Sequence, residues 1–432
     1  MPFDMPDGYR AQTTDTLASY LAGVPTLRVR LGGTPEQWRV REVSDGYLNL
    51  VFAVEGPAGA LCIKQALPHV REAKWWALPV ERTFFEHAFF ETVAPHVGGL
   101  IPAVYHYDPA LFLMAMELLT PHIILRRELI AGRRYPRAAT DVAEFIARSG
   151  FFTSSLFVPF EQRNERIALF GRNHGLLRIT ADLVFTDPYR ITDRNRWTGP
   201  QLDDIAARFR ADPHLKIAEQ RYSWRFLNDP QALIHSDLHS GSVTVTETDT
   251  RVIDPEFGVY GPIGLDLGAF VGNLLIAYFA QPGHATEADD RSTYQDWILE
   301  QVHRFWLHYR ARFLELWRTH SGGDVYQPGL FADPASAAAL DAERERFVAG
   351  LFDDMLAFAA IKMVRRILGY AHVADFDSIA DPDRRAACEA GALSLARDVL
   401  VNPARYRSTG DLLDAARRHT RTPLAAGGRH QL

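Results

Sequence analysis

The chain has 432 residues, of which 47% are hydrophobic and 11% aromatic, a length that predicts more than one lobe and a sizeable core. Its net charge is −6 and no block of lysine and arginine occurs, so a nucleic-acid partner is not expected. The only cysteines, Cys62 and Cys388, lie far apart, which excludes a disulfide framework and a cysteine-based zinc site and fits a reducing cytoplasm.

No membrane segment is expected. The N-terminal sequence MPFDMPDGYRAQ lacks the charged and apolar regions of a signal peptide. The longest uncharged apolar run, residues 267–280, is too short to span a bilayer and contains Asn273, so it predicts a buried helix.

Residues 1–119 are predicted to form a small, β-rich lobe. After a helix at 14–22, strands are expected at 38–43, 49–55 and 60–65, joined by turns at 44–49 and 56–59. A helix at 79–93 carries Glu86, and strands at 104–107 and 111–116 complete the lobe. Glu117, Leu118 and Leu119 form the expected hinge.

Residues 120–432 are predicted to form a larger, mostly helical lobe, which makes the fold class α+β. The helical signals cover residues 138–155, 201–210, 214–228, 292–319, 334–369, 384–401 and 409–419.

The stretch from residue 233 to residue 280 carries most of the expected chemistry. Two short strands, 232–234 and 251–253, each lead into an acidic loop, and a Gly-rich turn then leads to Asp266. An unpaired charge beside apolar sequence is costly, so these carboxylates need buried partners or a cation. The loops contain His235, Asp237, His239 and Ser242, and then Asp254 and Glu256.

These loops resemble those of the methylthioribose kinase family, in the aminoglycoside phosphotransferase group of the protein-kinase-like superfamily. The resemblance is carried by HSDLHSGS at 235–242 and by DPEFGVYGPIGLD at 254–266, in which DPE replaces the DFG of protein kinases. The segments SDGYLNLVF, CIKQALP, LPVER and RRILGYAHVAD also match in order, so the resemblance spans roughly residues 42–377. It implies a two-lobed kinase fold.

The kinase pattern assigns roles to Asp237, Asp254 and Glu256. Asp237 is the expected catalytic residue that orients the acceptor hydroxyl, and its alternative role is a turn cap. Asp254 and Glu256, linked by the rigid Pro255, are expected to hold Mg²⁺ together with Ser242. The alternative is a pair of turn carboxylates.

The small lobe is expected to bind ATP. Only four of the 47 basic residues are lysines, and Lys64 lies inside a strand, where it is expected to pair with nucleotide phosphates and with Glu86. The alternative is an edge-strand lysine that blocks aggregation. The resemblance adds Asn49 as a nucleotide contact, and residues 117–119 are the expected hinge contact.

The resemblance also implies the sugar site. Trp75 and Trp76 are expected to close over the sugar, and Arg365 and Arg366 to contact it or the transferred phosphate. Asp237 is also an expected substrate contact. The alternatives are two core tryptophans and a solvated arginine pair. Because adjacent helical residues point about 100° apart, one arginine, Arg365, is expected to face the site while the other braces it.

Three departures from the family pattern occur near these residues. Ser236 replaces a glycine beside Asp237, and it strains the loop if that position has a positive φ. Tyr47 replaces an asparagine in the first turn, and Gly258-Val259 replaces a bulkier pair.

The sequence therefore predicts a cytoplasmic, ATP- and Mg²⁺-dependent kinase that phosphorylates the anomeric hydroxyl of 5-methylthioribose, with no nucleic-acid or membrane partner. The resemblance further implies a homodimer. The alternatives are a kinase for another 5-modified pentose such as 5-deoxyribose, a metallohydrolase that uses His235, Asp237 and His239 with Asp254, and a nucleotide-binding protein without turnover.

Overall fold

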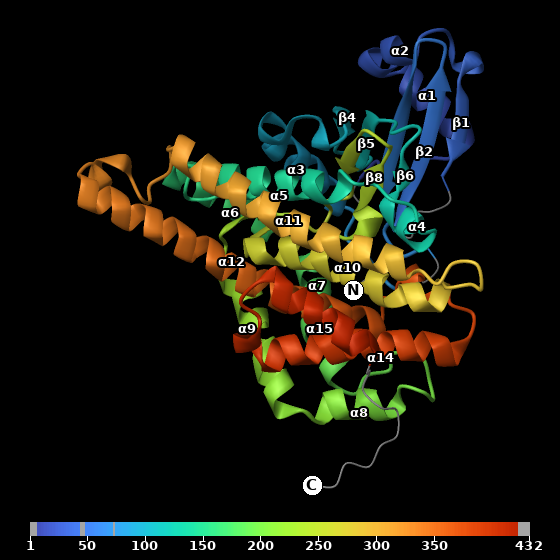
Figure 1. The fold of residues 1–432 in the computed structure, drawn as a ribbon. Helices are drawn as coiled ribbons and strands as arrows, with labels where there is room; N and C mark the ends of the chain where they lie inside the picture. The colour runs from blue at the N-terminus through green and yellow to red at the C-terminus, as the bar shows by residue number, and fades with distance from the viewer. Residues whose placement is uncertain (1–6, 44–47, 72–73, 422–432) are drawn as a thin grey trace.

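The computed structural model describes residues 7–43, 48–71 and 74–421. A small lobe that contains a five-stranded antiparallel sheet stands at one end of a larger, mostly helical lobe (Figure 1). The α+β, two-lobed class expected from the sequence is confirmed. The predicted boundary at residue 119 remains a prediction.

The sheet of the small lobe has the order β1-β2-β3-β5-β4, and helices cover both of its faces. On one face, apolar residues of α1 and α2 pack against Phe52, Leu61 and Ile63. On the other face, α3 packs against the sheet. The elements are α1 (Thr14–Ala22), α2 (Pro25–Leu31), β1 (Arg39–Glu42), β2 (Asn49–Gly56), β3 (Gly59–Ala66), α3 (Arg82–Val97), β4 (Val104–Asp108) and β5 (Leu113–Glu117).

Strand β3 explains the orientation of Lys64. Successive side chains of a strand point to opposite faces, so Leu61 and Ile63 face α1 and α2 while Cys62 and Lys64 face α3. Because β3 lies between β2 and β5, Lys64 is not on an edge strand, and the aggregation-blocking alternative is wrong.

The larger lobe is built around two long helices, α10 (Ile263–His284) and α12 (Pro334–Leu368), which pack directly against each other. The other helices are α4 (Leu125–Ile130), α5 (Ala138–Thr153), α6 (Phe160–Gly171), α7 (His174–Phe185), α8 (Asp203–Ala211), α9 (Pro213–Asn228), α11 (Ser292–Thr319), α13 (Ala374–Asp377), α14 (Pro382–Val401) and α15 (Thr409–Arg421). The short strands are β6 (Ile123–Ile124), β7 (Ala232–Ile234), β8 (Val243–Val245), β9 (Thr250–Val252) and β10 (Val259–Gly261).

Helix α10 is longer than its apolar run predicted. It starts at Ile263 and ends at His284, so by length and composition alone it would be able to cross a membrane. The apolar window that meets this test is entirely buried inside the protein, as in the core helix of a folded domain. The expected burial is confirmed, but the argument from short length was wrong.

The sequence did not predict α6, α7, β8 or β10. Only Phe170 is buried in α6, so that helix lacks a continuous apolar stripe. The two strands have three residues each, too few for a clear alternating pattern.

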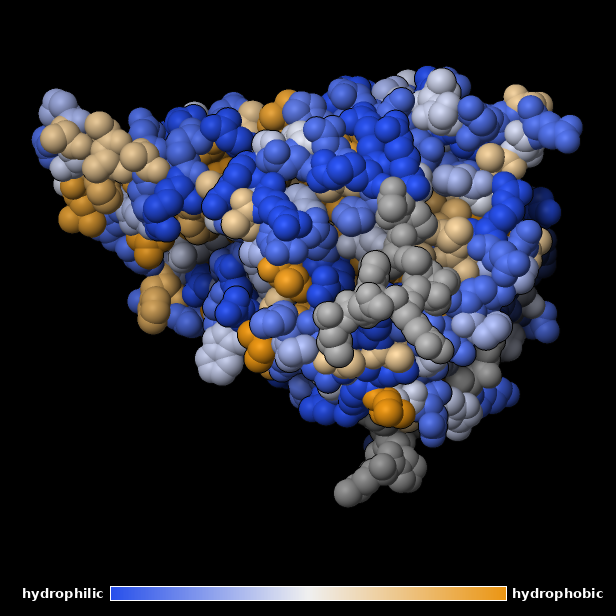
Figure 2. Space-filling view, turned by 60° about the horizontal axis from the view of Figure 1, so that its bottom comes forward, coloured by the Kyte–Doolittle hydropathy of each residue, from blue (hydrophilic) through white to orange (hydrophobic). Residues whose placement is uncertain are grey.

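One face of the molecule is mainly hydrophilic, with hydrophobic side chains in small separate groups (Figure 2).

Candidate active site

The loop after β7 has a strained backbone that is held from two sides. Ser236 has a φ of 70°, in the left-handed region that favours glycine. The backbone N–H groups of His235 and Ser236 donate to the two carboxylate oxygens of Asp266 on α10, at 2.7 and 2.8 Å. On the other side, the Ser236 carbonyl accepts from Lys362 Nζ at 3.0 Å. The strain expected from the serine at this position is therefore present.

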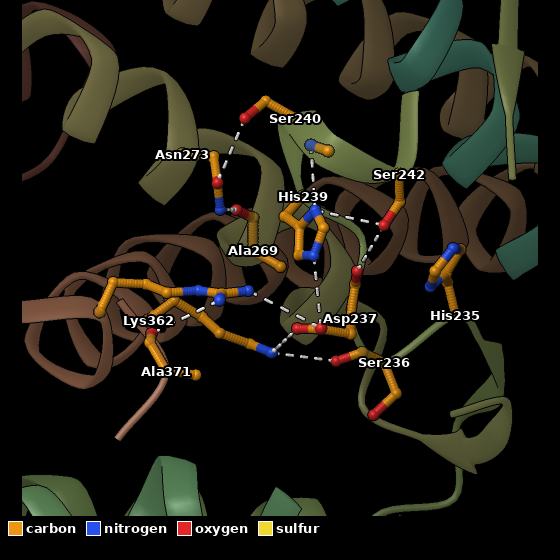
Figure 3. A network of polar contacts seen from close by, with 12 residues as sticks. His235, Ser236, Asp237, His239, Ser240, Ser242, Ala269, Asn273, Lys362 and Ala371 are labelled. Atoms are coloured by element: carbon orange, nitrogen blue, oxygen red, sulfur yellow. Dashed lines mark hydrogen bonds and ion pairs between the residues drawn. The ribbon is translucent and has the colours of Figure 1, made fainter. Parts of the chain in front are cut away.

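Asp237 lies at the centre of a basic cluster (Figure 3). Its Oδ1 accepts from Lys362 Nζ at 3.1 Å and lies 3.9 Å from Arg365 Nη1. Its Oδ2 lies 3.5 Å from His239 Nε2 and 3.7 Å from Arg366 Nη2. Burial alone would raise the pKa of Asp237, but Lys362, Arg365 and Arg366 hold it well below its usual range. The carboxylate is therefore ionised at neutral pH.

Helix α12 supplies three of these cations from one face. Lys362, Arg365 and Arg366 stand at positions i, i+3 and i+4, which are neighbours on a helix surface. Both arginines are buried, at 8% and 7% exposed, so the solvated-pair alternative is wrong. The expectation that only one of them faces the site is also wrong, because both approach Asp237. Lys362 was not identified from the sequence, although its rarity and its spacing from Arg365 were available signals.

His239 is held as a neutral donor. Its Nδ1 accepts the backbone N–H of Gly241 at 3.0 Å, which assigns the ring proton to Nε2, the atom that faces Asp237. Burial lowers the pKa of His239 well below its usual value despite the nearby Asp237, and Arg126 and Arg366 add to this effect.

The alternative His235–Asp237–His239 metal site is not formed. His235 Nε2 hydrogen bonds to the carbonyl of Ile253 at 3.0 Å, and in Figure 3 this ring lies on the opposite side of the loop from Lys362. Within residues 7–43, 48–71 and 74–421, the one group of three metal-ligating side chains is Glu86, Asp254 and Glu256. The hydrolase alternative therefore lacks its metal site in the part of the chain that the structure describes.

A second cluster, of carboxylates, connects the two lobes. Glu86 on α3 and the loop residues Asp254 and Glu256 bring one oxygen each within 4.8 Å of one another. Lys64 Nζ lies 2.7 Å from Glu86 Oε2 and also pairs with Asp254. Burial opposes the charge on Lys64, but Asp254, Glu86 and Glu256 outweigh it and raise its pKa. The expected Lys64–Glu86 pair is present.

This carboxylate cluster fits a hard divalent cation. Mg²⁺ prefers one or two carboxylates, and the Asp254 side chain is 46% exposed, so it is open to a ligand. The Ser242 hydroxyl hydrogen bonds to the Asp237 carbonyl at 3.3 Å and lies 3.2 Å from His239 Nδ1 (Figure 3). The role of Ser242 as a metal ligand stays a prediction.

Asn49 forms part of a buried network around Glu256. Its Nδ2 donates to Glu256 Oε2 at 3.0 Å, and its Oδ1 accepts from Arg82 Nη2 at 2.9 Å. Arg82 is fully buried, and its Nε lies 3.3 Å from Glu256 Oε2. The expected nucleotide contact of Asn49 is untested. Arg82 was missed, although it ends the LPVER segment, because a single arginine in the first turn of a helix carries no distinctive signal.

Two of the remaining expected residues, Trp76 and Glu117, contact the larger lobe. Trp75 is 78% exposed and stacks on Trp76 at 5.8 Å between ring centroids, so the core-plug alternative is wrong for Trp75. The Trp76 ring contacts the ring of Tyr370, which follows α12, with 5.2 Å between the ring centroids. Glu117 is the last residue of β5, and its carboxylate accepts from Arg251 Nη1 at 3.3 Å. Leu118 and Leu119 follow it and are half-buried.

The other two departures from the family pattern are at Gly258-Val259 and at Tyr47. Gly258 lies so close to Phe89 and to the Pro255 carbonyl that an added Cβ would be 3.0 and 3.1 Å from them, which explains a small residue here. Tyr47 and most of the predicted turn at 44–49 lie outside the described residues.

Comparison with known proteins agrees with this geometry. The pattern of the phosphotransferase enzyme family (APH) matches residues 39–309. The two lobes, the site and this match together define a kinase-like phosphotransferase.

Curated relatives narrow the assignment. A methylthioribose kinase from Escherichia coli O45:K1 (strain S88 / ExPEC) is 42% identical over 96% of this chain and 100% of its own length. Methylthioribose kinase 1 from Oryza sativa subsp. japonica is 40% identical over 94% of this chain and 95% of its own length. The methylthioribose kinase from Yersinia enterocolitica serotype O:8 / biotype 1B (strain NCTC 13174 / 8081) is 36% identical over 88% of this chain and 92% of its own length. The chain belongs to the methylthioribose kinase family.

Proposed function

We propose that the protein is an ATP-dependent sugar kinase that phosphorylates the anomeric hydroxyl of 5-methylthioribose. The observation that carries the proposal is the pairing of an ionised, cation-held Asp237 with a separate carboxylate cluster at Lys64. The names and near-complete coverage of the curated relatives support the same substrate.

In the proposed reaction, Asp237 orients the sugar hydroxyl and accepts its proton as the hydroxyl oxygen bonds to the γ-phosphorus. The bond between the γ-phosphorus and the β–γ bridging oxygen breaks, and ADP leaves with that electron pair. Arg365 and Arg366 lie beside Asp237 and stabilise charge on the transferred group. Lys64, oriented by Glu86, holds the nucleotide phosphates.

Asp254 and Glu256 would hold Mg²⁺, with Pro255 fixing the short link between them. When bound, Mg²⁺ neutralises negative charge on the phosphate oxygens. Asn49 and residues 117–119 are proposed as nucleotide contacts, and Trp75 and Trp76 as a cover over the sugar. We also propose a cytoplasmic homodimer, which light scattering after gel filtration would test.

The function is tested with a panel of ribose analogues that includes 5-methylthioribose, 5-deoxyribose and ribose, by measuring ATP-dependent ADP release. We expect the highest kcat/KM for 5-methylthioribose and phosphate attached at the anomeric carbon. A higher kcat/KM for 5-deoxyribose would overturn the proposed substrate but not the reaction class.

Asp237→Asn tests the catalytic residue. The variant keeps the shape of the side chain but cannot accept the proton, so kcat should fall at least about 100-fold with Mg·ATP binding unchanged. The control is Asp296→Asn, at an exposed carboxylate paired only with Arg417 in the described structure, which should leave kcat unchanged. Retention of more than about a tenth of wild-type kcat in Asp237→Asn would contradict the assignment.

A further inference from the structure

Lys362 connects α12 to the loop that carries Asp237 by two hydrogen bonds from one ammonium group. Its Nζ donates to the Ser236 carbonyl at 3.0 Å and to Asp237 Oδ1 at 3.1 Å. The residue is 2% exposed, so Lys362 cannot exchange these partners for water without moving the helix or the loop. Figure 3 shows both contacts converging on the same nitrogen.

The residue type is informative in this chain. Only four of the 47 basic residues are lysines, and Arg365 and Arg366 already occupy the same helix face. A compact ammonium fits where a third forked guanidinium would need more room and different donor directions. The two acceptors of Lys362 are adjacent in the chain, and the first belongs to the residue with the strained φ of 70°.

The two carboxylate oxygens of Asp237 differ in their contacts. Oδ1 receives the Lys362 hydrogen bond, whereas the nearest cationic or imidazole nitrogens around Oδ2 lie at 3.5 and 3.7 Å. Oδ2 is therefore less tightly engaged by the residues that the structure describes. A sugar hydroxyl that donates to Asp237 meets less competition at Oδ2 than at Oδ1.

We infer that Lys362 is a positioning residue of the reaction. It fixes the Ser236–Asp237 peptide and Asp237 Oδ1, and so presents Oδ2 to the sugar hydroxyl. This inference rests on the proposed function, because it assigns to Asp237 the role of proton acceptor. It adds a residue that acts through Asp237 rather than on the nucleotide.

Lys362→Met tests this role by removing the ammonium while keeping an unbranched side chain. Misplacement of a catalytic group by about 1 Å costs about 100-fold in rate, so kcat should fall by about that factor. The KM for Mg·ATP should change less than about threefold, because Lys362 is not among the nucleotide residues. Lys216→Met, a half-buried lysine on α9, is the matched control and should keep wild-type kinetics.

Two outcomes with Lys362→Met overturn the inference. One is a kcat within about threefold of wild type. The other is an equal loss in kcat, in Mg·ATP affinity and in folding, which would make Lys362 a structural residue only.

Lys362→Arg keeps the positive charge and tests the geometry if the Met variant does not fold. We expect a clear loss of kcat, because the guanidinium cannot reproduce both short contacts beside Arg365 and Arg366. A wild-type kcat in this variant would overturn the inference.

The double variant Asp237→Asn/Lys362→Met separates this inference from the proposed function. If Lys362 acts through Asp237, the second substitution adds little to the loss caused by the first. Independent, multiplying losses would overturn the role of Lys362 alone. An active Asp237→Asn variant would instead contradict the proposed function.

Discussion

At the residue scale, the loop before Asp237 combines strain with compensating contacts. A non-glycine residue in the left-handed region costs about 1–2 kcal/mol. Ser236 nevertheless adopts a φ of 70°. Two hydrogen bonds hold it there: its N–H donates to Asp266, and its carbonyl accepts from Lys362. The strained residue therefore stands between the two elements, α10 and α12, that set the position of Asp237.

Ser236→Gly should stabilise the protein by about 0.5–1 kcal/mol. The relief of the left-handed strain exceeds the entropy cost of a glycine in the unfolded chain. The buried Ser236 hydroxyl has no hydrogen-bond partner among the described residues, so its loss costs little. A higher thermal midpoint in calorimetry would confirm this expectation.

Ser236→Ala is the control, because it removes the same hydroxyl but keeps the Cβ and therefore the strain. Its midpoint should stay below that of Ser236→Gly. If Ala matches or exceeds Gly, the hydroxyl and not the backbone is the unfavourable feature.

At the element scale, the contact between α10 and α12 sets the position of the basic cluster. Gly264, Gly268 and Gly272 stand four residues apart on α10, and each lies against α12. At Gly268 an added Cβ would lie 2.5 Å from Phe358 Cβ and 2.6 Å from the Ala359 backbone nitrogen. The absence of a side chain therefore allows the close approach that brings Lys362, Arg365 and Arg366 to the loop.

Gly268→Ala should destabilise the protein by about 1–3 kcal/mol, because the new methyl group overpacks against the α12 backbone. It should also lower kcat, since a displaced α12 moves the cations away from Asp237. Thermal unfolding and steady-state kinetics measure the two effects together.

The matched control is Gly350→Ala, on α12 itself, where an added Cβ meets nothing within 4 Å. There the better helix propensity of alanine should raise stability by about 0.5–1 kcal/mol and leave kcat unchanged. Wild-type stability and kinetics in Gly268→Ala would show that the helix contact tolerates a methyl group.

The elements and motifs differ in how far the sequence predicted them. Strands with clear alternation and long amphipathic helices were predicted within a few residues, and α11 and α1 at their observed ends. The Lys64–Glu86 pair followed from the kinase pattern, in which a strand lysine pairs with a helix glutamate. Lys362, Arg82 and Asp266 were not assigned roles, because their partners lie on elements far away in the sequence and no local pattern marks a buried cross-element contact.

At the scale of the whole molecule, the carboxylate cluster is one of the connections between the lobes. Lys64 on β3 pairs with Asp254 from the larger lobe, while Asn49 and Arg82 contact Glu256. The carboxylates that are proposed to bind Mg²⁺ therefore also take part in contacts that join the two lobes.

Mg²⁺ and ATP together should stabilise the wild-type protein much more than ATP with EDTA. A ligand at 100 times its Kd adds about 2.7 kcal/mol to the free energy of unfolding, which appears as a higher thermal midpoint. Asp254→Ala should lose the Mg²⁺-dependent part of this increase and keep the part given by metal-free nucleotide, because Lys64 remains available to the phosphates.

Asp296→Ala, at an exposed carboxylate far along the chain on α11, serves as the control and should respond as wild type does. If Asp254→Ala keeps the full Mg²⁺ increment, or if the purified protein holds zinc and ignores Mg²⁺, the assignment of Mg²⁺ to this cluster is wrong.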